Sequence, residues 1–162
     1  MKTHEMSELF ALMMLAWPNA PMFQNGKMEP TIRLWTICLS EMDFTTGQAA
    51  VIRLCRTSKF PPSIAEMREA GEKIRKRVKG EADSVISSLR NETPFHSEKI
   101  RLRAERAIEL MGGEERLLTP IDENCSRYNI EDFRDAYRQV WREETRRTVQ
   151  ALYSPDAAEL PE

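Results

Sequence analysis

Residues 58–66 read Ser58-Lys59-Phe60-Pro61-Pro62-Ser63-Ile64-Ala65-Glu66, and this stretch decides how the chain is divided into helices. Neither proline can continue a helix, because each lacks a backbone N–H and restricts the residue before it. Ser63 and Glu66 have the spacing of a capping box, in which each side chain bonds the backbone N–H of the other residue. The stretch therefore predicts a rigid corner that ends one helix and begins a long one.

Upstream of the corner, apolar residues recur at steps of three and four, which is typical of one face of a helix. We expect a first helix over 6–17, a loop over 18–30 and a second helix from about Thr31. Thr45 and Gln48 also have capping-box spacing, so a third helix is predicted to begin at Thr45. These three helices are expected to bury their apolar faces together.

Downstream of the corner, the long helix carries a narrow apolar face, as expected for a helix that leaves the core. Ser97 can begin the next helix, and Gly112-Gly113 ends it, because glycine is the usual residue after a helix C-terminus. The last helix is predicted to start near Asn129, with acids in its first turn. No segment shows convincing strand alternation, so the predicted fold class is all-α.

The predicted elements divide the chain into four parts. The net charge is close to neutral in the first two thirds, but residues 112–162 hold seven Lys and Arg against twelve Asp and Glu. We expect a small N-terminal helical bundle over 1–70, a long connecting helix over 71–93, a C-terminal helical partner-binding module over 94–153, and an acidic tail over 154–162 that is disordered.

The composition argues against several classes of protein. The chain is 41% apolar and 31% charged, which is typical of a globular protein, and its net charge of −2 disfavours a main role in gripping nucleic acid. Its three cysteines and two histidines show no disulfide or zinc spacing, so no metal or cofactor is expected. The apolar run near the start is too short for a membrane span. Phosphate-binding loops and catalytic signatures are absent, so we expect no enzyme.

The order of residues from Trp35 to Met67 resembles the phage loader-and-inhibitor family of hexameric replicative helicases. The resemblance covers roughly the first seventy residues. A weaker likeness to replisome and helicase-loading proteins lies at Arg127, Phe133 and Tyr137, after a helix that ends in Gly-Gly. The N-terminal features that carry the resemblance are Glu8-Leu9-Phe10, Trp35, Asp43-Phe44 and Phe60-Pro61-Pro62-Ser63-Ile64-Ala65-Glu66.

The resemblance implies a non-enzymatic adaptor for phage DNA replication in the bacterial host cytoplasm. Such an adaptor binds a hexameric DnaB-type replicative helicase, holds it inactive and delivers it to the origin through a replisome organiser. It acts by protein contacts, with little or no direct nucleic-acid binding. Two alternatives stay open: a phage structural or assembly protein, and a DNA-binding regulator whose second and third helices form a helix-turn-helix with Gln48, Arg53 and Arg56 toward the bases.

The helicase-binding residues are predicted in the C-terminal module, on and beside the last helix. Aromatic and arginine side chains dominate the energetics of protein interfaces, and both are concentrated there. The apolar face of this helix has an equally good alternative, which is to pack on the preceding helix over 97–111. The predicted residues are Arg127, Phe133, Tyr137, Arg138, Val140, Trp141 and Arg142.

Two further stretches allow both a structural and a functional interpretation. Phe60, Pro61 and Pro62 are expected to turn the chain and tuck Phe60 into the core, with a secondary partner contact as the alternative. The basic cluster over 75–79 is expected to be a solvated helix face rather than a contact with single-stranded DNA, because acids surround it and no aromatic residue is interleaved with it.

Overall fold

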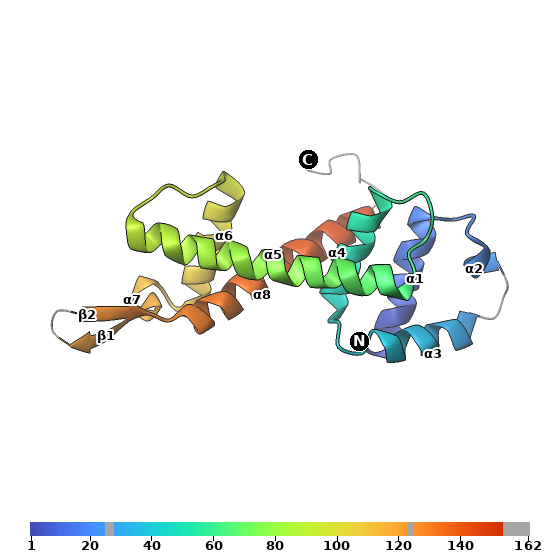
Figure 1. Ribbon diagram of the computed structural model, residues 1–162, viewed down its shortest axis with the longest axis horizontal. Coiled ribbons are helices and arrows are strands. Elements are labelled where there is room, and N and C mark those ends of the chain that lie inside the picture. Colours follow the sequence, from blue (N-terminus) through green and yellow to red (C-terminus); the bar gives the residue numbers. More distant parts are fainter. Residues whose placement is uncertain (25–27, 123–124, 154–162) are drawn as a thin grey trace. The chain divides into compact units, whose positions relative to one another are not determined.

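The computed structural model describes residues 1–24, 28–122 and 125–153, which form eight helices and one two-stranded sheet (Figure 1). The all-α class is thereby confirmed. The tail predicted over 154–162 lies outside the described residues. The elements are α1 (Thr3–Ala16), α2 (Pro21–Gln24), α3 (Met28–Cys38), α4 (Phe44–Cys55), α5 (Ile64–Asn91), α6 (Glu98–Met111), α7 (Glu114–Leu117), β1 (Leu118–Asp122), β2 (Cys125–Tyr128) and α8 (Ile130–Leu152).

The chain divides into two compact units, Met1–Arg75 and Lys76–Glu162, which we call unit 1 and unit 2. The boundary falls inside α5, so this helix contributes its first part to unit 1 and its second part to unit 2. Each unit has its own buried side chains, and each is described by itself below.

Unit 1 is built around α1, which packs against α3 and α4. The apolar face expected from the sequence is buried, and Phe10 lies at its centre. The ring of Phe10 meets Phe23 of α2 and Trp35 of α3 edge to face, at centroid distances of 6.0 Å and 5.2 Å. Such pairs add specific geometry to the burial of apolar area. The buried residues of α1 are Met6, Leu9, Phe10, Leu12 and Met13.

The corner forms where the sequence predicts it. The backbone N–H of Ser63 donates to Glu66 Oε2 at 2.7 Å, and the N–H of Glu66 donates to Ser63 Oγ at 3.3 Å, which completes the capping box at the start of α5. The expected burial of Phe60 is wrong, because Pro62 occupies the buried position and the Phe60 side chain is 76% exposed.

Two helix starts differ from the predictions. The cap of α4 is Asp43, whose carboxylate accepts the N–H of Thr46 at 3.1 Å and its hydroxyl at 2.7 Å. Thr45 is a buried residue inside this helix, so the predicted capping box at Thr45 is wrong. Helix α3 begins at Met28 rather than Thr31, because Pro30 sits in its first turn, where no backbone N–H has a partner in the helix.

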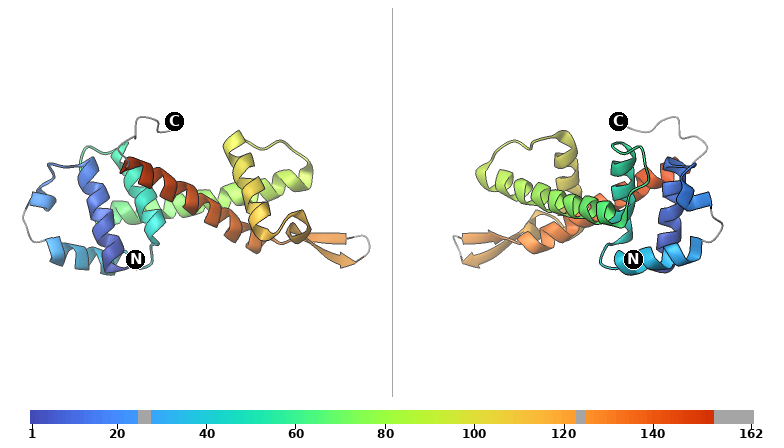
Figure 2. Two further views of the ribbon diagram at one scale, coloured as in Figure 1. Left: turned by 180° about the vertical axis from the view of Figure 1, so that it is seen from behind. Right: turned by 45° about the vertical axis from the view of Figure 1, so that its right-hand side comes forward.

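Unit 2 contains α6 packed against α8, with α7 and a hairpin between them in the chain (Figure 2). Ser97 caps α6 as predicted, accepting the N–H of Ile100 at 3.3 Å, and Gly112 ends it in the left-handed conformation at φ 100°. Strands β1 and β2 pair antiparallel, with Leu118 opposite Tyr128. The sequence predicted no strand here, since segments of four and five residues that include a proline show no clear alternation.

We expect replacement of Asp43 by alanine to lower the free energy of unfolding of unit 1 by about 1 kcal/mol, because the α4 N-terminus loses its cap. Asp43→Asn is the matched control, since asparagine caps helices nearly as well. Urea unfolding followed by circular dichroism measures both variants. Equal losses for the two would show that the capping bond is not what Asp43 contributes.

Candidate partner-binding surface

The apolar face of α8 lies inside unit 2. Phe133 and Tyr137 are fully buried, and Val140 and Trp141 are each 5% exposed. Because α8 packs on α6, the structure supports the alternative in which this face covers the preceding helix. These four of the seven predicted partner-binding residues are therefore not on the exposed surface of unit 2.

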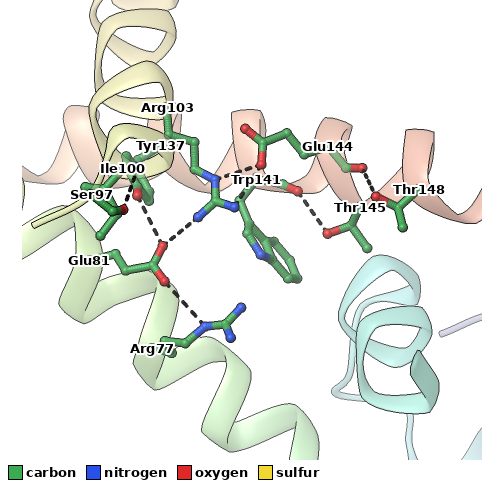
Figure 3. A network of polar contacts seen from close by, with 10 residues as sticks. All are labelled: Arg77, Glu81, Ser97, Ile100, Arg103, Tyr137, Trp141, Glu144, Thr145 and Thr148. Atoms are coloured by element: carbon green, nitrogen blue, oxygen red, sulfur yellow. Dashed lines mark hydrogen bonds and ion pairs between the residues drawn. The ribbon is translucent and has the colours of Figure 1, made fainter. Parts of the chain in front are cut away.

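Arg103 of α6 joins three helices of unit 2 from a position that is almost entirely buried (Figure 3). Its guanidinium lies 2.6 Å from a carboxylate oxygen of Glu81 on α5 and 2.8 Å from one of Glu144 on α8. The hydroxyl of Tyr137 donates to the same Glu81 oxygen at 3.2 Å. A buried arginine is tolerated only with such partners, so this network fixes α5, α6 and α8 at one register within unit 2.

Sequence reasoning missed Arg103, although one signal for it exists. The residue occurs on the buried face of α6 with Ala104 and Ala107, where a charge needs a partner. The partners, Glu81 and Glu144, are 22 and 41 residues away in the chain. Their identity among 26 acidic residues depends on the three-dimensional fold.

The exposed face of α8 carries two adjoining hollows, both within unit 2. The first, which we call the α6–α8 groove, has a volume of about 560 Å³ and is lined by Leu110, Met111 and Leu118 together with the acidic residues Glu115, Asp132 and Asp135 and further polar side chains. The second has a volume of about 480 Å³ and is lined by Asp135, Arg138, Gln139, Arg142, Glu143 and Arg146. Asp135 and Gln139 line both hollows, so the two form one continuous surface.

This surface combines apolar side chains with acidic ones. Leu110 is 47% exposed and Leu118 is 39% exposed, while Asp132 and Asp135 are exposed on the first turns of α8. Interfaces between proteins commonly pair an apolar centre with charges of complementary sign. A partner segment with apolar residues and basic flanks would match the α6–α8 groove.

The three predicted arginines of the C-terminal module are less buried than its aromatic residues. Arg138 is exposed and forms an ion pair with Asp135 at 2.8 Å, and Arg127 is exposed on β2. Arg142 is half-buried and lines the second hollow. Arg138 and Arg142 thus lie on the face of α8 that remains available, whereas Phe133, Tyr137, Val140 and Trp141 lie on the other.

In unit 1, the residues that a helix-turn-helix would use are only partly accessible. Arg53 and Arg56 are exposed, but Gln48 is buried at 8% exposure and cannot reach a base edge. Side chains of the basic cluster over 75–79 are exposed apart from Val78, as expected for a solvated helix face. Among the described ranges, no His, Cys, Asp or Glu side chains gather in threes that could hold a metal ion.

A comparison with known protein families matches the N-terminal part of the chain. Residues 1–68 match the family model for the N-terminal domain of the phage helicase loader and inhibitor, which is the family that the sequence resembles. No curated protein and no solved structure matches the chain. Within the part of the chain that the structure describes, no helix is both long and apolar enough to cross a bilayer.

The buried phenol of Tyr137 should titrate late, because burial raises its pKa to about 12. An ordinary tyrosine titrates near 10, so the folded state holds this proton more tightly than the unfolded state does. The network's contribution is then complete below pH 10 and is lost as the pH rises toward 12. We expect the urea midpoint of the protein to fall over this range by more than that of Tyr137→Phe, and the difference in absorbance at 295 nm between the two proteins to have its midpoint near pH 12. Identical alkaline profiles for both proteins would contradict the assignment.

Proposed function

We propose that this chain is an adaptor of phage DNA replication that binds a hexameric replicative helicase in the host cytoplasm. It holds the helicase inactive and delivers it to the origin through a replisome organiser, by protein contacts and without catalysis. The observation that carries the proposal is the match of residues 1–68 to the N-terminal domain of the phage helicase loader and inhibitor, which covers nearly all of unit 1.

The helicase contact is proposed on unit 2, at the α6–α8 groove and the adjoining face of α8 that carries Arg138 and Arg142. Two features support this position. Exposed apolar side chains at Leu110 and Leu118 give a partner area to bury, and Glu115, Asp132 and Asp135 give that partner a charge to match. The helicase segment that fits is amphipathic and basic, for example a helix that lays an apolar face in the groove.

Holding and release both follow from an interface of this kind. A groove of modest size, with acids at its rim, gives a contact whose strength depends on salt and on the shape of the partner segment. A helicase that changes conformation when it binds ATP or DNA would present this segment differently in its two states. The adaptor would then favour the state that it binds better.

Co-purification with the hexameric helicase of the host tests the function. We expect a complex that survives size-exclusion chromatography, with ATP present or absent changing its stability, and a reduced rate of DNA unwinding when the adaptor is in excess. No complex under either condition, together with unwinding at the unmodified rate, would overturn the proposal.

A charge placed in the groove should separate binding from folding. We expect Leu110→Asp to weaken helicase binding at least tenfold, because a carboxylate would replace an apolar contact and oppose the acidic rim. Leu102→Asp is the matched control: it also lies exposed on α6, at 44% exposure, but does not line the groove. Surface plasmon resonance measures both, and equal affinities for the two variants would move the contact elsewhere.

A further inference from the structure

We infer that unit 1 carries a second docking surface, at the end of α4 and the corner that follows it, for an acidic, amphipathic segment of a second protein partner. The surface, which we call the Phe60 surface, consists of Arg53, Arg56, Lys59 and Phe60. The inference rests on the proposed function, since an adaptor that delivers a helicase must also hold the protein to which it delivers.

Phe60 is a large apolar side chain held out into solvent on a constrained backbone. Its side chain is 76% exposed, and Pro61 and Pro62 follow it directly. The hydroxyl of Ser58 accepts the N–H of Phe60 at 3.2 Å and donates to its carbonyl oxygen at 2.8 Å. Because the backbone is already ordered, a partner that buries this ring loses little conformational entropy on binding.

The start of the corner is tied to the core of unit 1 as well. The indole N–H of Trp17, a buried residue after α1, donates to the carbonyl oxygen of Ser58 at 3.4 Å. On the other side, Pro62 is buried and the capping box at Ser63 begins α5. Phe60 therefore stands between two anchored points, so its exposure is a property of the fold of unit 1 rather than of a loose loop.

Three positive charges accompany the ring without opposing acids. Arg53, Arg56 and Lys59 are all exposed, and none of them forms an ion pair with a described residue. No Asp or Glu occurs from residue 44 to residue 65. The nearest following acid is Glu66, and Ser63 already donates to its carboxylate through both its N–H and its hydroxyl, each at 2.7 Å.

The chemistry favours a protein segment over a nucleic acid. Single-stranded nucleic acid is bound by several aromatic side chains that stack successive bases along a continuous basic groove. Phe60 is the lone aromatic in residues 45–94, and the first turns of α5 bring acids at Glu66, Glu69 and Glu72 next in the chain. A short segment with one apolar side chain for Phe60 and carboxylates for the arginines fits the surface without extending past it.

The Phe60 surface and the α6–α8 groove differ in sign. The first presents cations around an apolar ring, and the second presents Asp132, Asp135 and Glu115 around apolar side chains. Like charges across an interface are costly, so a segment that suits one surface is rejected by the other. Each unit is thereby suited to a different partner, which assigns the Phe60 surface to the protein at the origin rather than to the helicase.

The test compares Phe60→Ala with Ile37→Ala in the full chain, using the phage's replisome organiser and the host helicase as the two probes. Ile37 is the matched control, since it is 72% exposed on α3 of the same unit. We expect Phe60→Ala to weaken organiser binding at least tenfold, with Ile37→Ala within twofold of the original chain and helicase binding unchanged in both. A double variant, Arg56→Gln with Lys59→Gln, is expected to weaken organiser binding at least fivefold and to make it less sensitive to salt.

Each other outcome overturns a distinct statement. If the organiser binds the original chain and Phe60→Ala equally, the Phe60 surface is not its site, although the proposed function stands. If the organiser does not bind the original chain, the proposed function loses its second partner and the inference is lost with it. Binding of a labelled oligothymidylate that depends on Phe60 would assign the surface to nucleic acid. Loss of helicase binding in Phe60→Ala would assign it to the helicase.

Discussion

The buried guanidinium of Arg103 is the interaction on which unit 2 depends. It satisfies carboxylates from two other helices, and the hydroxyl of Tyr137 joins one of them. An unpartnered charge at this depth would be strongly unfavourable, so the three helices fit together in only one register. That register turns the apolar face of α8 inward and leaves Arg138 and the α6–α8 groove at the surface. The shape offered to a partner is a consequence of a charge that no partner touches.

The two units meet the same physical demand in different ways. Unit 1 relies on aromatic packing about Phe10 and on a corner of two prolines, and it leaves a ring and three cations exposed at that corner. Unit 2 relies on a buried polar network and leaves a groove with acidic walls. Because the exposed chemistry of one unit is opposite in charge to that of the other, the chain has the composition of a connector between unlike proteins although its net charge is only −2.

Features that depend on a few neighbouring residues could be predicted from the sequence. The capping box of Ser63, the start of α6 at Ser97 and the glycine that ends α6 each follow from bonds made within one turn of the chain. Local pattern also misled, since Thr45 has the spacing of a cap but Asp43, two residues earlier, offers a stronger acceptor and takes the role. Short strands such as β1 lie below the length at which alternation becomes visible. The candidate surfaces could be predicted less well, because they depend on which side of a helix or corner becomes buried. The partner prediction rested on aromatic residues of α8, whereas packing on α6 buries such residues first. The burial of Pro62 in place of Phe60 likewise depends on contacts far away in the chain, among them the bond from Trp17 to Ser58.

The separation of the two faces of α8 has a consequence for how such a protein can change over generations. Substitutions at Phe133 or Tyr137 disturb the interior and are removed by selection whatever the partner is. Substitutions at Leu110 or Arg138 alter the outer face at little cost to folding. A phage that enters a host with a different helicase can therefore adjust its recognition one surface residue at a time, while the inherited scaffold beneath stays the same.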